Sequence, residues 1–83
     1  LDGGNAAHHY NLGLALQKDG QNREAIEAFQ QAIAIEPSHA KAHLSEALSF
    51  QRIGDLSQAR KALEKLLRVD PQNSVASRLL QRM

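Results

Sequence analysis

The feature that most constrains this chain is an internal repeat. Identical residues recur at a constant offset of 34, as in the pairs Gly20/Gly54 and Pro37/Pro71. Repeats of this length bury their apolar faces mainly against neighbouring repeats, so they form elongated stacks. We expect residues 1–5 to be a flexible leader or a cloning remnant. The remaining chain divides into repeat one at 6–39, repeat two at 40–73, and a capping or truncated third-repeat helix at 74–83.

Apolar residues inside each unit recur at the three- and four-residue steps that line one face of a helix, as Ala25, Phe29 and Ala32 do. A glycine interrupts each unit near its middle. The pattern predicts helices near 5–19, 22–35, 39–53, 56–69 and 74–82. No segment alternates as a strand does, so the expected fold class is all-α, with five helices.

Turn chemistry supports these boundaries. Gly54 can take the left-handed conformation that ends a helix, and Asp55 can cap the next helix. Pro37 and Pro71 cannot continue a helix and bias the preceding residue away from helical dihedral angles. The second helix of each unit should therefore stop near Ile35 or Val69.

These residues resemble the tetratricopeptide repeat (TPR) family, whose pattern includes Leu-Gly, Ala-x3-Phe and a closing proline. The first unit carries Leu12-Gly13, Ala25-x3-Phe29 and Pro37, and the second carries Ala59-x3-Leu63 and Pro71. Four positions depart from the pattern: His9 and His43 stand in place of tryptophan, Leu16 in place of tyrosine, and Glu46 in a slot that should be apolar. The resemblance implies a right-handed α-solenoid of helix-turn-helix repeats.

Composition excludes several classes of protein. The chain has 83 residues and a formal charge of +1, which is too balanced for electrostatic binding of nucleic acid. There is no cysteine, so thiolate metal sites and thiol nucleophiles are absent. No apolar run is long enough to span a membrane. The sequence leaves the localisation unknown, with the cytoplasm as the default.

The histidines are candidate metal ligands, because His39 and His43 lie four positions apart on an expected helix. His43 repeats His9 at the repeat period, in a slot that the family fills with a large packing ring. We therefore interpret both as packing residues and expect no metal and no cofactor. Neither a Gly-x-Ser-x-Gly motif nor a phosphate-binding glycine loop is present, so we expect no enzyme activity.

The resemblance implies a concave groove, lined by the first helix of each repeat, that binds a partner peptide or helix. The candidate peptide-binding residues are Tyr10, Asn11, Leu14, Gln17, Lys18, Lys41, Leu44, Ser45, Leu48, Gln51, Arg52 and Arg78. The apolar members would supply contact area, the amides would bond a peptide backbone, and the cations would attract an acidic ligand. The alternative interpretation is that the leucines pack between helices and the cations are simply solvated.

Some family members grip the C-terminal carboxylate of chaperones with a lysine and asparagines in this groove. The equivalent positions here hold Tyr10, Leu14, Ser45, Val75 and Leu79, so the sequence predicts that this clamp is absent.

We therefore expect a non-enzymatic protein-protein interaction module, a fragment of a larger scaffold or assembly protein. The alternative function is self-association of the parent protein. Two features favour this alternative: the apolar segment 74–83, and a charge of −3 over residues 1–39 (two cations, five acids) against +4 over 40–83 (eight cations, four acids).

Overall fold

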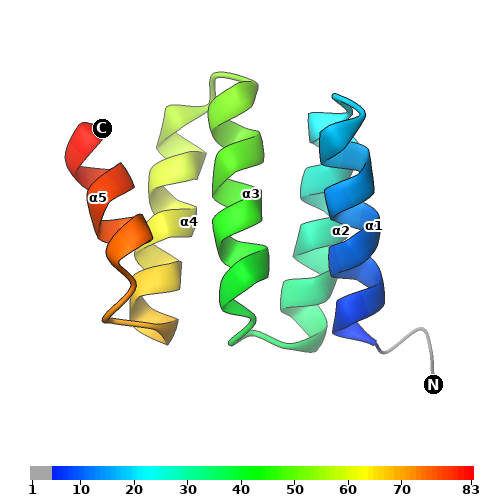
Figure 1. Cartoon of the computed structure of the whole chain (residues 1–83), viewed down its shortest axis with the longest axis horizontal. Helices are drawn as coiled ribbons and strands as arrows, with labels where there is room; N and C mark the ends of the chain where they lie inside the picture. The colour runs from blue at the N-terminus through cyan, green and yellow to red at the C-terminus, as the bar shows by residue number, and fades with distance from the viewer. Residues whose placement is uncertain (1–4) are drawn as a thin grey trace.

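The computed structural model describes residues 5–83 as five α-helices joined by short loops (Figure 1). The helices are α1 (Ala6–Lys18), α2 (Asn22–Ile35), α3 (Ala40–Arg52), α4 (Leu56–Val69) and α5 (Ser74–Arg82). Every helix end lies within one residue of its prediction, and no strand occurs in the described part of the chain. The predicted all-α solenoid is confirmed.

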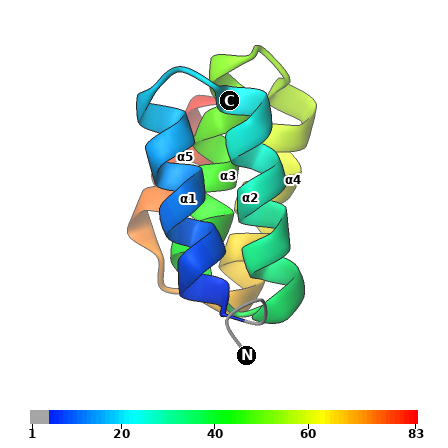
Figure 2. The same cartoon turned by 90° about the vertical axis from the view of Figure 1, so that its right-hand side faces the viewer.

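The helices form two layers, with α1, α3 and α5 in one and α2 and α4 in the other (Figure 2). Each helix packs mainly on its neighbours in the sequence, α1 on α2, α2 on α3, α3 on α4 and α4 on α5. The result is an elongated body of 38 × 26 × 16 Å. Its two ends are the α1–α2 hairpin and α5, which lie far apart (Figure 1).

The helices of the first layer share a capping device that recurs at the repeat period. The Asn5 and Asn73 side-chain oxygens and the His39 Nδ1 atom each accept a hydrogen bond from a backbone N–H two or three residues later, at 2.9, 2.9 and 3.1 Å respectively. Such caps satisfy backbone donors that have no partner inside the helix. Asn5, which the sequence placed in an expected leader, is therefore the N-cap of α1. The rest of that segment, 1–4, lies outside the described residues.

The turns between the layers follow the predicted chemistry. Gly20 and Gly54 have φ angles of +79° and +84°, in the left-handed region that favours glycine. The Asp55 carboxylate accepts a hydrogen bond of 3.1 Å from the Gln58 backbone N–H and caps α4. Each of these turns reverses the chain within three residues, so each pair of helices packs as an antiparallel hairpin.

Each second helix ends where its proline predicts, α2 at Ile35 and α4 at Val69. The loop after α2 is tied to α3 through His43, whose Nε2 atom donates to the Pro37 carbonyl oxygen at 2.8 Å. The imidazole is 3% exposed. His43 is thus the packing residue that the repeat pattern predicted.

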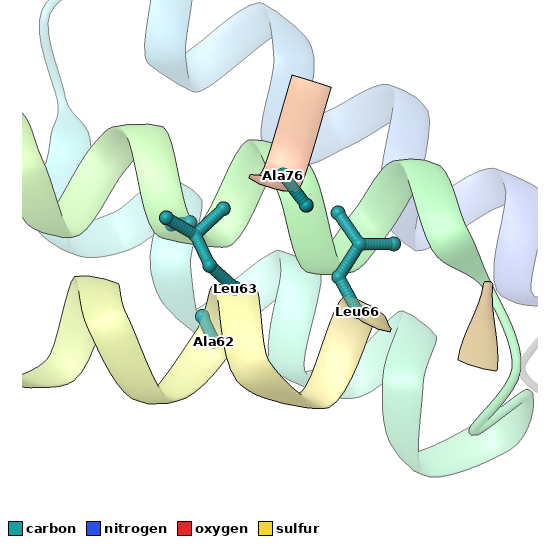
Figure 3. Close-up of a cluster of buried hydrophobic side chains, with 5 residues drawn as sticks. Ala62, Leu63, Leu66 and Ala76 are labelled. Atoms are coloured by element: carbon teal, nitrogen blue, oxygen red, sulfur yellow. The ribbon is translucent and has the colours of Figure 1, made fainter. Parts of the chain in front are cut away.

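The core is built largely from alanine. Nine of the thirteen buried hydrophobic residues described are alanines, and such small side chains let helices approach closely. Two of the larger members, Leu63 and Leu66 of α4, point toward Ala76 of α5 and join it in one cluster (Figure 3). This cluster fixes α5, the third helix of the first layer, against α3 and α4.

Candidate functional site

The predicted site residues come together on one layer, and we call the exposed side of α1, α3 and α5 the α1–α3–α5 face. Six candidates are exposed there: Asn11, Lys18, Lys41, Gln51, Arg52 and Arg78. Five are half-buried and Ser45 is buried; the half-buried ones are Tyr10, Leu14, Gln17, Leu44 and Leu48. The exposed and half-buried groups differ in what they contact.

Gln17 joins α1 to α3. Its side-chain Nε2 donates to the Ser45 carbonyl oxygen at 3.1 Å and to the Ser49 hydroxyl at 2.9 Å. An amide nitrogen carries two hydrogens, and both are engaged by these bonds. Gln17 and Ser45 therefore connect α1 to α3, and the side-chain N–H groups of Gln17 are not available to hydrogen-bond a peptide.

Tyr10 is also part of the scaffold. Its ring centroid lies 4.9 Å from that of His39 and 6.0 Å from that of Phe29, within the range of favourable aromatic contacts. The ring packs against the buried cluster of Ala6, Ala32 and Ala42. Tyr10 thus connects both hairpins, and a ligand could reach only the part of it that stays exposed.

The half-buried leucines are not equivalent. Leu44 packs against the cluster formed by α3, α4 and α5, which agrees with the interpretation of inter-helix packing for that residue. Leu14 and Leu48 occupy equivalent positions in the two repeats and remain half-buried beside the exposed polar residues. They are the apolar part of the α1–α3–α5 face.

The charges on this face have one sign. Its exposed cations are Lys18, Lys41, Arg52, Arg78 and Arg82. The three helices contain a single carboxylate, Glu46, which is 7% exposed. Counting charges along the sequence misses this separation, which emerges only when alternate helices are grouped into a layer. The face is therefore cationic although the whole chain is nearly neutral.

Glu46 lies on the opposite side of α3. Burial raises the pKa of its carboxyl group above 4.5, and a hydrogen bond with Gln30 and the nearby Lys65 and His43 side chains only partly offset this. A carboxyl in such a place does not neutralise the cations of the α1–α3–α5 face. Glu46 stands at a position that is apolar in the family pattern, and polar neighbours on α2, α3 and α4 accommodate it.

Within residues 5–83, no group of three or more His, Cys, Asp or Glu side chains could hold a metal ion. No helix in the same range has the length and hydropathy needed to cross a membrane.

Two layers of alternating helices, built from one recurring hairpin unit, define this chain as a solenoid of helical hairpins. A family described as tetratricopeptide repeat matches residues 16–83. The chain therefore belongs to the tetratricopeptide repeat family, as its motifs predicted.

Solved structures agree with this assignment. The crystal structure of MamA has a TM-score of 0.93 and 30% identity, over 96% of this chain and 47% of that one. The second TPR domain of human RPAP3, solved in complex with the HSP70 peptide SGPTIEEVD, has a TM-score of 0.90 and 29% identity, over 96% of this chain and 67% of that one.

Curated relatives are longer proteins. The TPR repeat-containing protein YsoA of Bacillus subtilis is 30% identical over 56 residues, which is 68% of this chain and 17% of YsoA. A probable peptide N-acetylglucosaminyltransferase, SPINDLY of Hordeum vulgare, is 29% identical over 79 residues, which is 95% of this chain and 8% of that protein. The chain thus spans less than a fifth of either relative.

Proposed function

We propose that this unit is a non-enzymatic interaction module that binds an acidic peptide segment on the α1–α3–α5 face. The observation that carries the proposal is the separation of charge, since the face exposes five cations and its helices contain one buried carboxylate. Complementary charge speeds the encounter with a ligand and disfavours ligands of the wrong sign.

The apolar and polar groups of the face suit an extended or helical peptide. Leu14 and Leu48 offer contact area one repeat apart, and Asn11 and Gln51 offer exposed amides beside them. Lys18 and Arg52 occupy equivalent positions, so they place two cations one repeat apart. A peptide lying along the stack would meet the same kinds of groups twice.

The comparison with RPAP3 supports a peptide ligand of this chemistry, because the HSP70 peptide in that complex ends in EEVD, with three acidic residues. The mode of capture proposed here differs. Tyr10, Leu14 and Ser45 occupy positions where a carboxylate clamp requires a lysine and asparagines, so binding depends on side-chain charge rather than on a free C-terminus.

The small share of YsoA and SPINDLY that this chain covers supports a place within a larger scaffold or assembly protein. The module brings a partner to that protein and performs no chemistry of its own.

The test is a chemical-shift titration of the 15N-labelled chain with the peptide SGPTIEEVD. The comparison peptide is SGPTIQQVN, in which amides replace the three side-chain carboxylates and the free C-terminus is kept. We expect the acidic peptide to perturb backbone amides around Lys18, Leu48 and Arg52, and the neutral one to bind more weakly. Equal binding of both peptides, or shifts confined to α2 and α4 around Glu27 and Lys61, would contradict the proposal.

A further inference from the structure

A hollow of about 350 Å³ lies at the junction of the two repeats. Both repeats contribute to its wall, so its place is inside the stack rather than at either end. None of the lining residues is a candidate of the α1–α3–α5 face. We call this space the inter-repeat hollow. It is lined by Ile33 of α2, Pro37 of the following loop, His43 of α3, and Lys65, Arg68 and Val69 of α4.

His43 accounts for part of this space. It stands where the family pattern has tryptophan, and an imidazole is much smaller than an indole. The Nε2 atom donates to the Pro37 carbonyl oxygen at 2.8 Å, which leaves Nδ1 as an acceptor. Nδ1 is buried and has no hydrogen-bond partner within residues 5–83. A buried acceptor without a donor is destabilising, so this wall can gain from a ligand that supplies one.

The rest of the lining combines apolar groups with positive charge. Ile33, Pro37 and Val69 are apolar, and no carboxylate lines the hollow. Lys65 and Arg68 lie three positions apart on one side of α4, and both are exposed. The inter-repeat hollow therefore suits a group that is apolar and carries a negative charge directly beside its apolar part.

The two cations are not equivalent. Lys65 also lies near the buried Glu46, whose carboxyl group it influences. Arg68 is the cation on which the charge of the hollow can be tested without disturbing that carboxyl group.

The C-terminal residue of a polypeptide has this combination of groups. Successive side chains of an extended peptide point to opposite sides, so an apolar residue and a neighbouring Asp or Glu would not enter one hollow together. An aliphatic C-terminal residue carries its side chain and a carboxylate on the same carbon atom. Its amide N–H is next to both and is the kind of donor that Nδ1 of His43 lacks. A fatty acid brings the aliphatic chain and the carboxylate but no donor.

We propose that the inter-repeat hollow binds the C-terminal residue of a partner polypeptide that ends in an aliphatic side chain. The side chain contacts Ile33, Pro37 and Val69, and the carboxylate lies beside Arg68. This site is separate from the α1–α3–α5 face. The acidic peptide SGPTIEEVD ends in a polar residue, so the two sites can be tested independently.

The first test is a chemical-shift titration of the 15N-labelled chain with the peptide GSGSL, which has a free C-terminal carboxylate. We expect the backbone amides of Ile33, His43 and Val69 to shift, with a dissociation constant of roughly 1 mM, which is typical of so small a contact. The amides of Leu14 and Leu48 should stay in place. No shift up to about 10 mM peptide, or shifts centred on Leu14 and Leu48, overturns the proposal.

The second test changes the ligand. GSGSL with an amidated C-terminus lacks the carboxylate, and GSGSS lacks the aliphatic side chain. Each should bind about fivefold more weakly or worse than GSGSL. Equal binding of either peptide contradicts recognition of an aliphatic C-terminal residue. The third ligand, 4-methylpentanoate, keeps the carboxylate and aliphatic chain of leucine without the amide, and should also bind more weakly. Equal binding of 4-methylpentanoate would assign the hollow to a free aliphatic acid and overturn the proposal.

The third test changes the protein, with a matched control for each variant. Arg68→Glu should weaken GSGSL binding about fivefold, whereas Lys61→Glu makes the same charge change on α4 outside the lining and should bind like the wild type. Val69→Thr should weaken binding about threefold, because a hydroxyl replaces a methyl group of the wall. Its control is Ile35→Thr, at the equivalent position of the first repeat and outside the lining.

Thermal unfolding followed by circular dichroism verifies that all four variants are folded. Equal weakening in a variant and its control would contradict the assignment to the inter-repeat hollow.

Discussion

Gly13 and Phe29 form a close approach between the helices of the first hairpin. A Cβ atom built on Gly13 would lie 2.5 Å from Cε1 of the Phe29 ring, and the ring is fully buried. The second hairpin has Ala47 and Leu63 at the same two positions, and both belong to its core cluster. The two repeats thus fill the equivalent space with different pairs. Glycine faces a phenylalanine ring in the first repeat, and alanine faces the smaller leucine in the second.

This relationship predicts the effect of enlarging Gly13. Gly13→Leu should lower the free energy of unfolding by about 2–3 kcal/mol, because the ring has little room to move. In a double-mutant cycle, Gly13→Ala and Phe29→Leu together should cost less than the sum of the separate changes, by about 1 kcal/mol. Urea denaturation of the four proteins measures this coupling. Strict additivity would show that the two positions do not share one space.

The repeat period was enough to predict the helices, because prolines, glycines and small residues act locally on the backbone. The role of each site residue depended on the tertiary structure. Gln17 and Gln51 are identical residues at equivalent positions, yet Gln17 bonds α3 while Gln51 is exposed. The difference arises from the side chains and carbonyl groups of the next helix in the layer, which the pattern of a single repeat does not specify.

The cap of α3 gives a second prediction. His39→Ala removes the acceptor for the Ala42 N–H, so the free energy of unfolding should fall by about 1 kcal/mol. His39→Asn keeps a capping oxygen, as Asn5 and Asn73 do, and loses only the ring contact with Tyr10. Thermal unfolding should therefore rank the wild type and His39→Asn above His39→Ala. An Asn variant as unstable as the Ala variant would assign the effect to the ring contact.

Glu46 gives a prediction for pH. Its pKa is raised on folding, so between pH 4.5 and the higher folded value the native state binds more protons than the unfolded state. The contribution of Glu46 to stability therefore falls as pH rises through that range. Glu46→Gln removes the titration and keeps an amide that can bond Gln30.

The difference between the two proteins isolates this group from the other carboxylates. Glu46→Gln should be more stable than the wild type at pH 7, and its advantage should shrink as the pH is lowered toward 4.5. Urea denaturation over a series of pH values provides the measurement. A difference that is constant with pH would mean that burial does not perturb this carboxyl.

Variants of Gln17 and Gln51 distinguish a residue that stabilises the fold from one that is available for binding. Gln17→Ala leaves the Ser49 hydroxyl, which is 0% exposed, without its donor, and the free energy of unfolding should fall by about 1–2 kcal/mol. Gln51→Ala, at the equivalent but exposed position, should change stability by less than about 0.5 kcal/mol. If peptide binding uses the exposed amides, Gln51→Ala weakens it. A larger stability loss for Gln51→Ala than for Gln17→Ala would contradict these roles.

The last prediction concerns the cations that carry the proposed binding. Lys18→Glu combined with Arg52→Glu should slow the association of the acidic peptide and reduce its dependence on salt, because both groups attract the ligand before contact. Dissociation should change less. The matched control is Lys61→Glu with Arg68→Glu on α4, which alters the net charge equally on exposed residues outside the face. Stopped-flow fluorescence at several salt concentrations separates the two rate constants. The same slowing in the control would mean that net charge, rather than the α1–α3–α5 face, governs recognition, and an unchanged rate in Lys18→Glu/Arg52→Glu would place the binding site elsewhere.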